Sequence, residues 1–414
     1  HNLTNVARVE ATCTEDGRTA GKKCSRCDYT EGMAVIKALG HDYQTVPGTP
    51  ATCTESGITD GRKCSRCQDE ITGEVIQPKG HSWDGGKKER SLNDDYVLAT
   101  TYSCRNCSET KVEVYKYDRI YGNTRIETSQ KVAEAKLELN GKESFDTIVL
   151  ACASNFPDAL GGSYLAACVD APMLLIDPSD PWTTLNYLDG KMTDGGKVYI
   201  LGGNAAVPTG VDPVLESRGL DVTRCMGNTR IDTNLDVLNT IGVAGQSELV
   251  ICSATGFADS LSASSSGRPI FIVDKAFTPE QKMWIQNHIF DRYVILGGTA
   301  AVPSSVGNEI MSLTGCAEGD IIRLAGESRY QTSKKIADYF FPHARRMLLA
   351  YGDNFPDGLS GGAYAHLLDC PVVLVNQQST QDAADYASDK NRTYCVTLGG
   401  PGLISDQNVY TIYP

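Results

Sequence analysis

The stretch that decides the fold is VYILGGNAAVP at residues 198–208, which returns as YVILGGTAAVP at 293–303 and as CVTLGGPGLIS at 395–405. Each copy joins an apolar run to a pair of glycines. Three other signatures precede each copy in the same order, the first being Arg-x-x-Gly-x-[Thr/Ser]-Arg-x-x-Thr. Self-similarity at a period of roughly 100 residues predicts tandem modules.

The apolar runs inside each module predict parallel sheets. One run leads into SNFPDALGG, TGFADSLSA or DNFPDGLSG, and a second reads APMLLID, RPIFIVD or CPVVLVN. Continuous apolar runs of about four to seven residues that alternate with helical stretches are typical of strands buried on both faces. Each module is therefore expected to be a small α/β layer fold.

The turn after the first strand is expected to start a helix. In SNFPDALGG, Asn155 can cap the helix, Pro157 suits its first turn, and Asp158 favours the positive end of the helix dipole. The glycine pair after the last strand permits a tight turn or a close backbone approach. Ligands of open α/β sheets bind at this end of the strands, so the sequence predicts a binding groove there.

In combination, the Arg-Gly-Thr-Arg openings, the FPDAL and FADSL turns and the ILGG-x-x-AVP endings resemble the cell wall binding repeat type 2 family. The resemblance covers residues 119–414. It implies Rossmann-like or flavodoxin-like modules, three of which pack around a pseudo-threefold axis. It also implies a non-covalent anchor on Gram-positive bacteria that holds an anionic secondary polymer of the wall, such as a polysaccharide or a teichoic-acid-like chain.

The copies depart from one another at two places. The second has Ala258 where the others have Pro157 and Pro356, and the third ends in LGGPGLIS without Ala-Val-Pro. If three equivalent grooves bind polymer, the third is expected to be the weakest.

The repeated arginines and acids are the candidate polymer-binding residues. A planar guanidinium can clamp phosphate or carboxylate groups, which suits an anionic polymer. The alternative is structural: Arg125, Arg230 and Arg329 would pair with the repeated acids and hold turn to turn or module to module. The polymer-binding or inter-module candidates are Arg119, Arg125, Asp158, Arg224, Arg230, Asp259, Arg323, Arg329 and Asp357.

The N-terminal region carries a second repeat system with a period of 40 residues, seen at His1, His41 and His81. Units this small bury too little apolar surface to fold alone and need a metal or disulfide staple. Three cysteines and one histidine make a tetrahedral zinc site, and KCSRC supplies its C-x-x-C knuckle. The predicted zinc ligands are His1, Cys13, Cys24, Cys27, His41, Cys53, Cys64, Cys67, His81, Cys104 and Cys107.

The ligand set leaves alternatives open. Disulfides between neighbouring units are the alternative to zinc, because the region's cysteines are an even set and extracellular proteins favour disulfides. The histidine before or after each cysteine trio can be the fourth ligand. We prefer the preceding one, so that His1 serves Cys13 and its two partners, and His41 serves the next trio. The third unit lacks the first cysteine, and Asp94 would complete a weakened site there.

Charge and motifs argue against several classes of function. The net charge is −13, and no basic stripe suits nucleic acid. No apolar run reaches the roughly 18 residues of a membrane span. The nucleophile elbow, the P-loop lysine and the dinucleotide-binding glycine motif are missing from the sequence, which predicts no enzyme activity. His288 and His343 are expected to be solvated or capping, and His366 to pack against a helix.

The sequence therefore predicts a secreted, non-enzymatic protein of the cell wall or cell surface, processed so that it begins at His1. The strand cysteines Cys152, Cys252 and Cys395 are expected to be buried hydrophobes. A self-assembling protomer of a surface layer or extracellular filament, hence a homo-oligomer, is the alternative function. The expected units are Cys-rich repeats at 1–40, 41–80 and 81–117, and wall-binding modules at 118–223, 224–322 and 323–414.

Overall fold

The computed structural model describes residues 1–92, 97–389 and 392–414. The chain divides into two compact units. The Cys-rich unit comprises His1–Lys87 and Thr101–Val112, and the α/β unit comprises Lys88–Thr100 and Glu113–Pro414. Among the described helices, none combines the length and apolar character that a membrane span requires.

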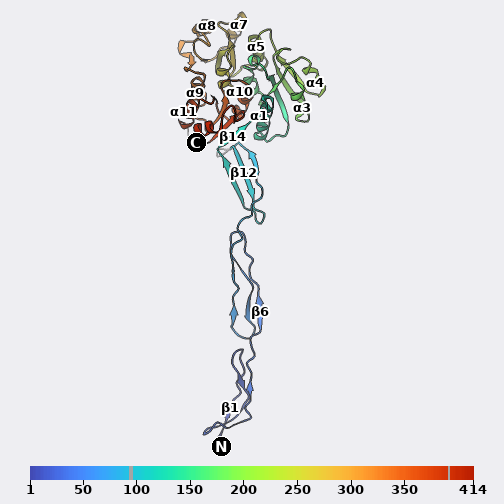
Figure 1. Cartoon of the computed structure of the whole chain (residues 1–414), viewed down its shortest axis with the longest axis vertical. Helices are drawn as coiled ribbons and strands as arrows, with labels where there is room; N and C mark the ends of the chain where they lie inside the picture. Colours follow the sequence, from blue (N-terminus) through green and yellow to red (C-terminus); the bar gives the residue numbers. More distant parts are fainter. Residues whose placement is uncertain (93–96, 390–391) are drawn as a thin grey trace. The chain divides into compact units, whose positions relative to one another are not determined.

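Short antiparallel sheets build the Cys-rich repeats, which include β1 and β6 in Figure 1. In the first repeat, Leu3 lies opposite Cys24 across a strand pair, and Tyr43 and Cys64 repeat this pairing in the second. This places each histidine beside the C-x-x-C knuckle of its own repeat. The strand orders are β1-β3-β4, β2-β5, β6-β8-β9, β10-β7 and β11-β12-β13. The bounds are β1 Leu3–Val6, β2 Gly17–Arg18, β3 Gly21–Cys24, β4 Thr30–Glu31, β5 Val35–Ile36, β6 Tyr43–Val46, β7 Gly57–Ile58, β8 Gly61–Cys64, β9 Glu70–Ile71, β10 Val75–Ile76, β11 Lys87–Arg90, β12 Leu98–Ser103 and β13 Thr110–Tyr115.

Cysteines take the place of an apolar core in these repeats. Within His1–Lys87, the buried hydrophobic side chains are Cys13, Cys24, Ala51, Cys53 and Cys64. So small a set cannot offset the conformational entropy lost on folding, so something must join the thiols to one another.

Three four-stranded parallel sheets form the α/β unit, which confirms the prediction of α/β repeats with parallel strands. Their orders are β16-β15-β17-β18, β20-β19-β21-β22 and β14-β25-β23-β24. The edge strands β16, β20 and β24 are buried at every residue, and the central strands β15, β19 and β23 are buried along most of their length, as the continuous apolar runs predict. The strand bounds are β14 Tyr117–Ile120, β15 Phe145–Cys152, β16 Met173–Ile176, β17 Met192–Leu201, β18 Asp221–Cys225, β19 Glu248–Ser253, β20 Ile270–Val273, β21 Arg292–Leu296, β22 Ile321–Leu324, β23 Arg346–Tyr351, β24 Val372–Val375 and β25 Tyr394–Leu398.

Each sheet takes its fourth strand from the next repeat. β18, which opens the second repeat, pairs with β17 of the first, and β22 of the third pairs with β21 of the second. β14, which opens the first repeat, pairs with β25 of the third. The repeats are therefore closed into a ring by the strands that begin them.

Helices also pack across the repeat boundaries. α1 lies beside α10 of the third repeat (Figure 1), α5 packs on α2 of the first, and α9 packs on α6 of the second. One apolar cluster accordingly contains side chains of all repeats, among them Leu165, Leu261 and Tyr364. The helix bounds are α1 Arg125–Leu139, η1 Pro157–Ala159, α2 Gly162–Cys168, α3 Trp182–Tyr187, α4 Val211–Ser217, α5 Arg230–Ile241, α6 Ala258–Ala263, α7 Pro279–Asn287, α8 Ser304–Thr314, η2 Glu318–Asp320, α9 Arg329–Phe340, α10 Pro356–Leu367, α11 Gln381–Asp389 and α12 Asp406–Ile412.

The turn after the first strand differs in detail from the prediction. Phe156, not Asn155, is the capping position of η1, and the Asn155 side chain accepts a hydrogen bond from the Phe156 N–H. Pro157 lies in the first turn as expected, but the α-helix itself begins only at Gly162. In the third repeat the helix runs without a break from Pro356.

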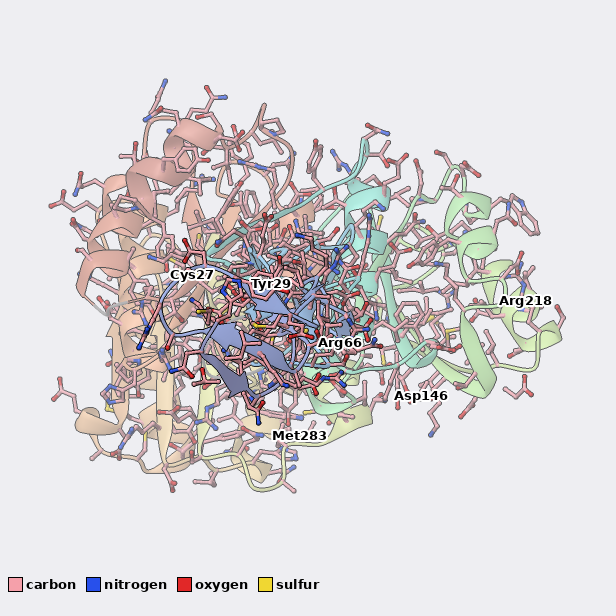
Figure 2. All side chains as sticks on the ribbon, turned by 90° about the horizontal axis from the view of Figure 1, so that it is seen from below. Cys27, Tyr29, Arg66, Asp146, Arg218 and Met283 are labelled. Carbon is pink, nitrogen blue, oxygen red and sulfur yellow. The ribbon has the colours of Figure 1, made fainter. Side chains whose placement is uncertain are left out.

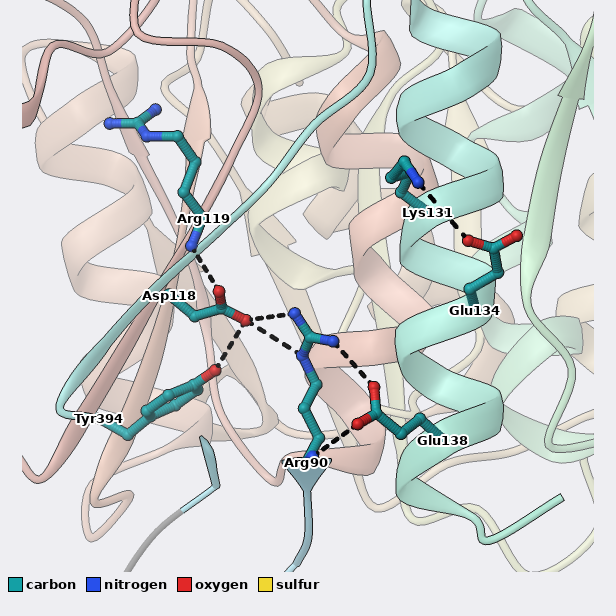
Figure 3. A network of polar contacts seen from close by, with 7 residues as sticks. All are labelled: Arg90, Asp118, Arg119, Lys131, Glu134, Glu138 and Tyr394. Carbon is teal, nitrogen blue, oxygen red and sulfur yellow. Dashed lines mark hydrogen bonds and ion pairs between the residues drawn. The ribbon is translucent and has the colours of Figure 1, made fainter. Parts of the chain in front are cut away.

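A polar network holds the strand that closes the ring (Figure 3). Asp118 on β14 accepts hydrogen bonds from the Arg90 guanidinium at 2.7 and 3.1 Å and from the Tyr394 hydroxyl of β25 at 3.3 Å. Arg90 also donates to Glu138 on α1 at 2.9 Å. The Asp118 side chain is only 8% exposed, so its ion pair with this guanidinium is largely shielded from solvent.

We predict that Arg90→Ala lowers the free energy of unfolding of the α/β unit by about 3 kcal/mol, because it leaves the buried Asp118 carboxylate without its ion pair. The measurement is urea unfolding followed by helical circular dichroism, since all the described helices lie in this unit.

The matched control is Lys131→Ala, which removes the exposed 3.8 Å pair with Glu134 that Figure 3 also shows. Its expected cost is below about 0.5 kcal/mol. Equal losses in the two variants would contradict the role assigned to Arg90.

Candidate functional site

The opening motif forms a strand, a tight turn and a helix start in every repeat. Thr124, Thr229 and Ser328 cap the opening helices with their side chains. The motif threonine accepts a hydrogen bond from the motif glycine, as Thr128 does from the Gly122 N–H at 3.1 Å. The glycine, the capping residue and the threonine are thus structural, which leaves the two arginines for other roles.

The first arginine of each motif binds the glycine turn of the sheet that its strand joins. Arg119 donates to the Gly399 carbonyl at 2.8 Å, Arg224 to Gly202 at 2.7 Å, and Arg323 to Gly297 at 2.8 Å. These bonds fasten the exchanged strand to the turn beside it.

Acids outside the candidate set pair with two of these arginines. Arg119 binds Asp406 at 2.8 Å, and Arg224 binds Asp212 through two nitrogens. For Arg323 the described residues show no carboxylate within ion-pair distance. Arg119 and Arg224 therefore form ion pairs within the fold, in addition to their bonds to the glycine turns.

The second arginine of each motif binds the end of its own central strand. Arg125 donates to the Ala153 carbonyl at 2.8 Å, Arg230 to Ala254 at 2.8 Å, and Arg329 to Gly352 at 2.7 Å. Each contact uses one nitrogen of the guanidinium, at the carboxyl end of a parallel sheet.

The repeated acids lie under the glycine turns. A Cβ placed on Gly202, Gly297 or Gly399 would come within 2.4–2.6 Å of the carboxylate of Asp158, Asp259 or Asp357, respectively. The three glycines have φ between +84° and +96°, which other residues rarely adopt. The first glycine of each pair is thus required for two reasons: its positive φ and the carboxylate that leaves no room for a Cβ.

Burial raises the pKa of Asp357 to about 6, against the attraction of Arg125, and also raises the pKa of Asp259 against that of Arg329. The interacting arginine belongs to the next repeat around the ring in both cases. No direct ion pair joins these partners among the described residues. The direct ion pair that Arg329 forms is with Asp353 of its own repeat, at 3.8 Å.

A cluster of phenylalanines at the strand ends was not predicted, although phenylalanine recurs in SNFPD, TGFAD and DNFPD. Phe156, Phe257 and Phe355 contact one another with ring centroids 5.4–6.0 Å apart. The guanidinium of Arg125 lies over the Phe355 ring at 5.9 Å, and that of Arg329 over Phe257 at 5.6 Å. The rings thus help to orient the second arginines.

Two grooves lie at the carboxyl ends of the strands, as predicted, and each crosses a repeat boundary. The groove between the third and first repeats, here called the third–first groove, has a volume of about 370 Å³. It lies between Arg125 of the first repeat and, in the third repeat, Asp357 with the glycine turn that begins at Gly399. The second–third groove has a volume of about 550 Å³. It lies between Arg329 of the third repeat and, in the second repeat, Asp259 with the glycine turn that begins at Gly297. Each is large enough for part of a chain molecule and presents one arginine, one buried acid and a glycine turn.

The cysteines and histidines of the Cys-rich unit form separate clusters. The groups are Cys13, His41, Cys64 and Cys67; Cys53, His81, Cys104 and Cys107; and His1, Cys24 and Cys27. Within each group the ligand atoms all lie within 4.8 Å of one another.

The distances in these clusters fit a tetrahedral metal and not a disulfide. The Cys13 and Cys64 sulfurs are 3.7 Å apart, and those of Cys53 and Cys104 are 3.8 Å apart. A disulfide requires about 2.05 Å. Sulfurs about 2.3 Å from a tetrahedral zinc ion lie roughly 3.8 Å apart. The residues present therefore fit zinc.

The predicted grouping of these ligands is wrong in one member. Each histidine does serve the C-x-x-C of its own repeat, but Cys13 joins the site of His41, and Cys53 joins that of His81. The reason is that the chain before each histidine is bound to the preceding cysteine turn, as Gly40 N–H is to the Cys13 carbonyl at 3.0 Å. Asp94 lies outside the described residues, and the His81 site is complete without it.

Backbone N–H groups prepare the knuckle sulfurs for a cation. Burial opposes ionisation of Cys64, but N–H groups of Arg66 and Asp42 and the His41 ring lower the pKa of this thiol to about 6. The pKa of Cys104 is lowered to about 6 chiefly by the Asn106 N–H. Thiolates are the form that binds zinc.

The remaining histidines take structural positions. His288 ends α7 and stacks on Trp284, as the capping prediction has it. His366 on α10 is exposed and contacts the Ser265 carbonyl of the second repeat through Nδ1 at 3.0 Å. His343 is exposed. Cys152, Cys252 and Cys395 are buried, also as predicted.

Tandem α/β repeats that exchange strands and form grooves at their boundaries define a repeat-built binding protein. The chain belongs to the family described as Cell wall binding domain 2 (CWB2), whose model matches residues 119–212, 224–307 and 323–410. It is therefore a cell-wall-binding protein of the cell surface, and the family resemblance is confirmed.

Two curated relatives come from Bacillus subtilis (strain 168). The chain is 23% identical over 293 residues to the N-acetylmuramoyl-L-alanine amidase LytC, covering 69% of this chain and 56% of the amidase. It is 24% identical over 287 residues to the Amidase enhancer, covering 68% of this chain and 38% of that protein. The chain thus spans about half or less of these relatives.

Two solved structures share the fold. Cwp8 from Clostridium difficile aligns with a TM-score of 0.65 at 15% identity, over 99% of this chain and 79% of that one. Cwp6 from the same organism aligns with a TM-score of 0.64 at 16% identity, over 100% of this chain and 68% of that one.

We predict that Gly297→Ala destabilises the α/β unit by about 1–3 kcal/mol, because alanine resists the positive φ and its Cβ meets the Asp259 carboxylate. Gly298→Ala, one residue on, is the control: its Cβ meets nothing within 4 Å, and its expected effect is within about 0.5 kcal/mol. Thermal unfolding measures both, and a Gly298→Ala loss as large as that of Gly297→Ala would contradict the assignment.

Proposed function

We propose that this protein is a non-enzymatic anchor whose repeats, arranged as Rossmann-like modules about a pseudo-threefold axis, hold an anionic polymer of the cell wall in the grooves between them. The observation that carries the proposal is the repeated groove, with an arginine from one repeat facing a glycine turn and buried acid of another. Because each groove needs two repeats, binding and ring closure support each other.

The groove chemistry suits an anionic chain rich in hydroxyl groups. Arg125 and Arg329 each bond a strand end through one nitrogen, which in Arg329 also faces the Asp353 carboxylate at 3.8 Å, and their other nitrogens can bind phosphate or carboxylate oxygens. A raised pKa lets Asp357 be partly protonated in mildly acidic surroundings, which reduces repulsion of an anion. A protonated carboxyl also donates a hydrogen bond to a sugar oxygen.

Two observations favour binding without catalysis. The third–first groove is lined by one carboxylate, Asp357, whereas glycoside hydrolysis uses a pair, and in the second–third groove the acid beside Asp259 is the exposed Glu327. The matches to the amidase and the Amidase enhancer cover 293 and 287 residues of those longer proteins, close to the length of the three modules here. Family membership thus accounts for the amidase match without an amidase site in this chain.

The wall-binding prediction is tested by sedimentation with isolated Gram-positive walls before and after mild acid extraction of their secondary polymers. We expect saturable binding that extraction abolishes. Equal binding to extracted walls would contradict the proposal, and growth of particles with concentration in the absence of walls would favour the self-assembling alternative.

Arg125→Gln and Arg329→Gln are each expected to weaken wall binding at least tenfold, because charge-assisted hydrogen bonds to an anion are lost. The control is Arg292→Gln, at the opposite end of a strand whose carboxyl end meets the second–third groove. Arg292 is 57% exposed, and its partner Glu248 keeps Arg268. A loss shared by the control would point to nonspecific charge.

We further propose that the complete Cys₃His clusters bind structural zinc, with His1, Cys24 and Cys27 as a partial site. Each complete zinc site would join the first cysteine of one repeat to the histidine and knuckle of the next. The near absence of an apolar core in these repeats and the 3.7–3.8 Å sulfur separations support this proposal.

Metal analysis of the full chain, purified with a non-thiol reductant, is expected to give at least two tightly bound zinc ions. Cys64→Ser should remove one of them, and chelator should abolish ordered structure in the Cys-rich unit. Cys168→Ser, at an exposed cysteine outside the clusters, should leave the zinc content unchanged. A metal-free chain with intact strands would contradict the zinc proposal.

A further inference from the structure

The second–third and third–first grooves are built from the same motifs but differ in size. Their volumes are about 550 and 370 Å³, respectively. Because the motifs repeat, each residue that lines one groove has an equivalent in the other groove. The difference in volume can therefore be traced to individual side chains.

Smaller side chains line the second–third groove at four equivalent positions. The pairs, with the residue of the second–third groove first, are Ser253 and Tyr351, Gly256 and Asn354, Ala258 and Pro356, and Ala301 and Leu403. At the two lining positions where the second–third groove has the clearly larger residue, Ala300 and Glu327, that residue is exposed. The wider groove is therefore widened by side chains that are missing from its walls.

Ala301 and Leu403 occupy the same place in the two grooves. A Cβ placed on Gly297 would meet the Ala301 Cβ at 3.1 Å, and a Cβ placed on Gly399 would meet the Leu403 side chain at 3.3 Å. Leu403 is 38% exposed and lines the third–first groove. The fold thus accepts a leucine at this position, whereas alanine leaves the space open.

Two phenylalanine rings line the wider groove. Phe257 belongs to the second repeat and Phe156 to the first, and both rings are only partly buried. Their centroids lie 5.5 Å apart. The equivalent Phe355 of the third repeat is buried, and Tyr351 is the aromatic residue among the described residues that line the third–first groove. The second–third groove thus draws on all three repeats and offers a larger aromatic surface.

Charged groups lie beside these rings. The Arg329 guanidinium lies over the Phe257 ring, 5.6 Å from its centroid, and Asp259 lies under the glycine turn across the groove. Aromatic walls with a few placed polar groups are typical of sites for ligands that have both apolar and polar parts. A sugar ring is such a ligand, because its C–H face can pack on an aromatic ring while its oxygens meet the charged groups. A polyol chain has no comparable face.

We propose that the second–third groove holds a sugar ring of the wall polymer against Phe156 and Phe257, whereas the third–first groove holds a narrower anionic link between sugars. This inference rests on the proposed anchoring function and narrows its ligand to a polymer that contains sugar rings. The four small lining residues determine this specificity, because the bulkier side chains of the third–first groove leave too little room for a ring.

Variants of the full chain test this division between the grooves by sedimentation with isolated Gram-positive walls. Ala301→Leu, which copies the third–first groove, should weaken wall binding at least tenfold. Leu403→Ala only widens the other groove and should change binding by less than about twofold. Met283→Ala is the control, because it removes an exposed apolar side chain of α7, labelled in Figure 2, that lines neither groove.

Phe156→Ala should also weaken wall binding at least tenfold, and Phe156→Trp, which keeps an aromatic face, should restore most of it. Thermal unfolding of both variants shows whether the α/β unit remains folded. If Phe156→Ala does not fold, Ala301→Leu still tests the inference, since the fold accepts leucine at the equivalent position.

Soluble polymers test the chemistry of the ligand. Phosphorylated dextran, which has sugar rings, and poly(glycerol phosphate), which has none, are compared as competitors of wall binding at equal phosphate content. We expect phosphorylated dextran to compete at a concentration at least tenfold lower, and Ala301→Leu to remove most of this difference.

Phosphorylated dextran that competes no better than poly(glycerol phosphate) would overturn this inference, as would wall binding that Ala301→Leu leaves unchanged. Either result leaves the anchoring function standing if Arg329→Gln still weakens wall binding. A wild-type chain that does not bind walls would instead overturn the proposed function itself.

Discussion

The α/β unit depends on the pairing of β14 with β25. These two strands lie far apart in the sequence, and their pairing closes the ring of repeats. One edge of every sheet pairs with a strand from another repeat, so no repeat forms a complete sheet by itself. An unpaired edge would expose a row of backbone groups and the apolar faces of the central strands. The closing strand β14 therefore stabilises the whole ring as well as its own sheet. Its acidic residue, Asp118, is buried and forms an ion pair with Arg90.

Strand exchange also creates the grooves. Because β14 enters the third sheet, α1 begins beside Asp357 and the glycine turn at Gly399, and it places Arg125 next to them. β22 and α9 bring Arg329 to the second repeat in the same way. The grooves are thus a consequence of how the sheets are completed.

Much of this architecture could be predicted from the sequence, because buried parallel strands leave continuous apolar runs and because three copies of each signature exclude chance. The candidate arginines and acids do lie at the carboxyl ends of the strands. What could not be predicted is which copy each residue meets. Periodicity shows that Asp357 and Arg125 recur, but the same pattern results whether each acid faces its own arginine or that of the next repeat. The phenylalanine cluster was missed for a similar reason, since an apolar residue in a motif reads as ordinary core.

The zinc ligands show the same limit. A repeat of 40 residues gives the ligand types, yet Cys13 is nearer in sequence to His1 and Cys24 than to His41. The backbone bond from Gly40 to the Cys13 turn shows that Cys13 joins the following repeat. In both units of this protein, then, the structural unit is displaced from the sequence repeat, because each sheet and each four-residue cluster draws on two repeats. The α/β repeats satisfy this requirement by closing on themselves. In the Cys-rich unit the completion runs along the chain instead, because Cys13 of the first repeat serves the His41 cluster and Cys53 of the second serves the His81 cluster.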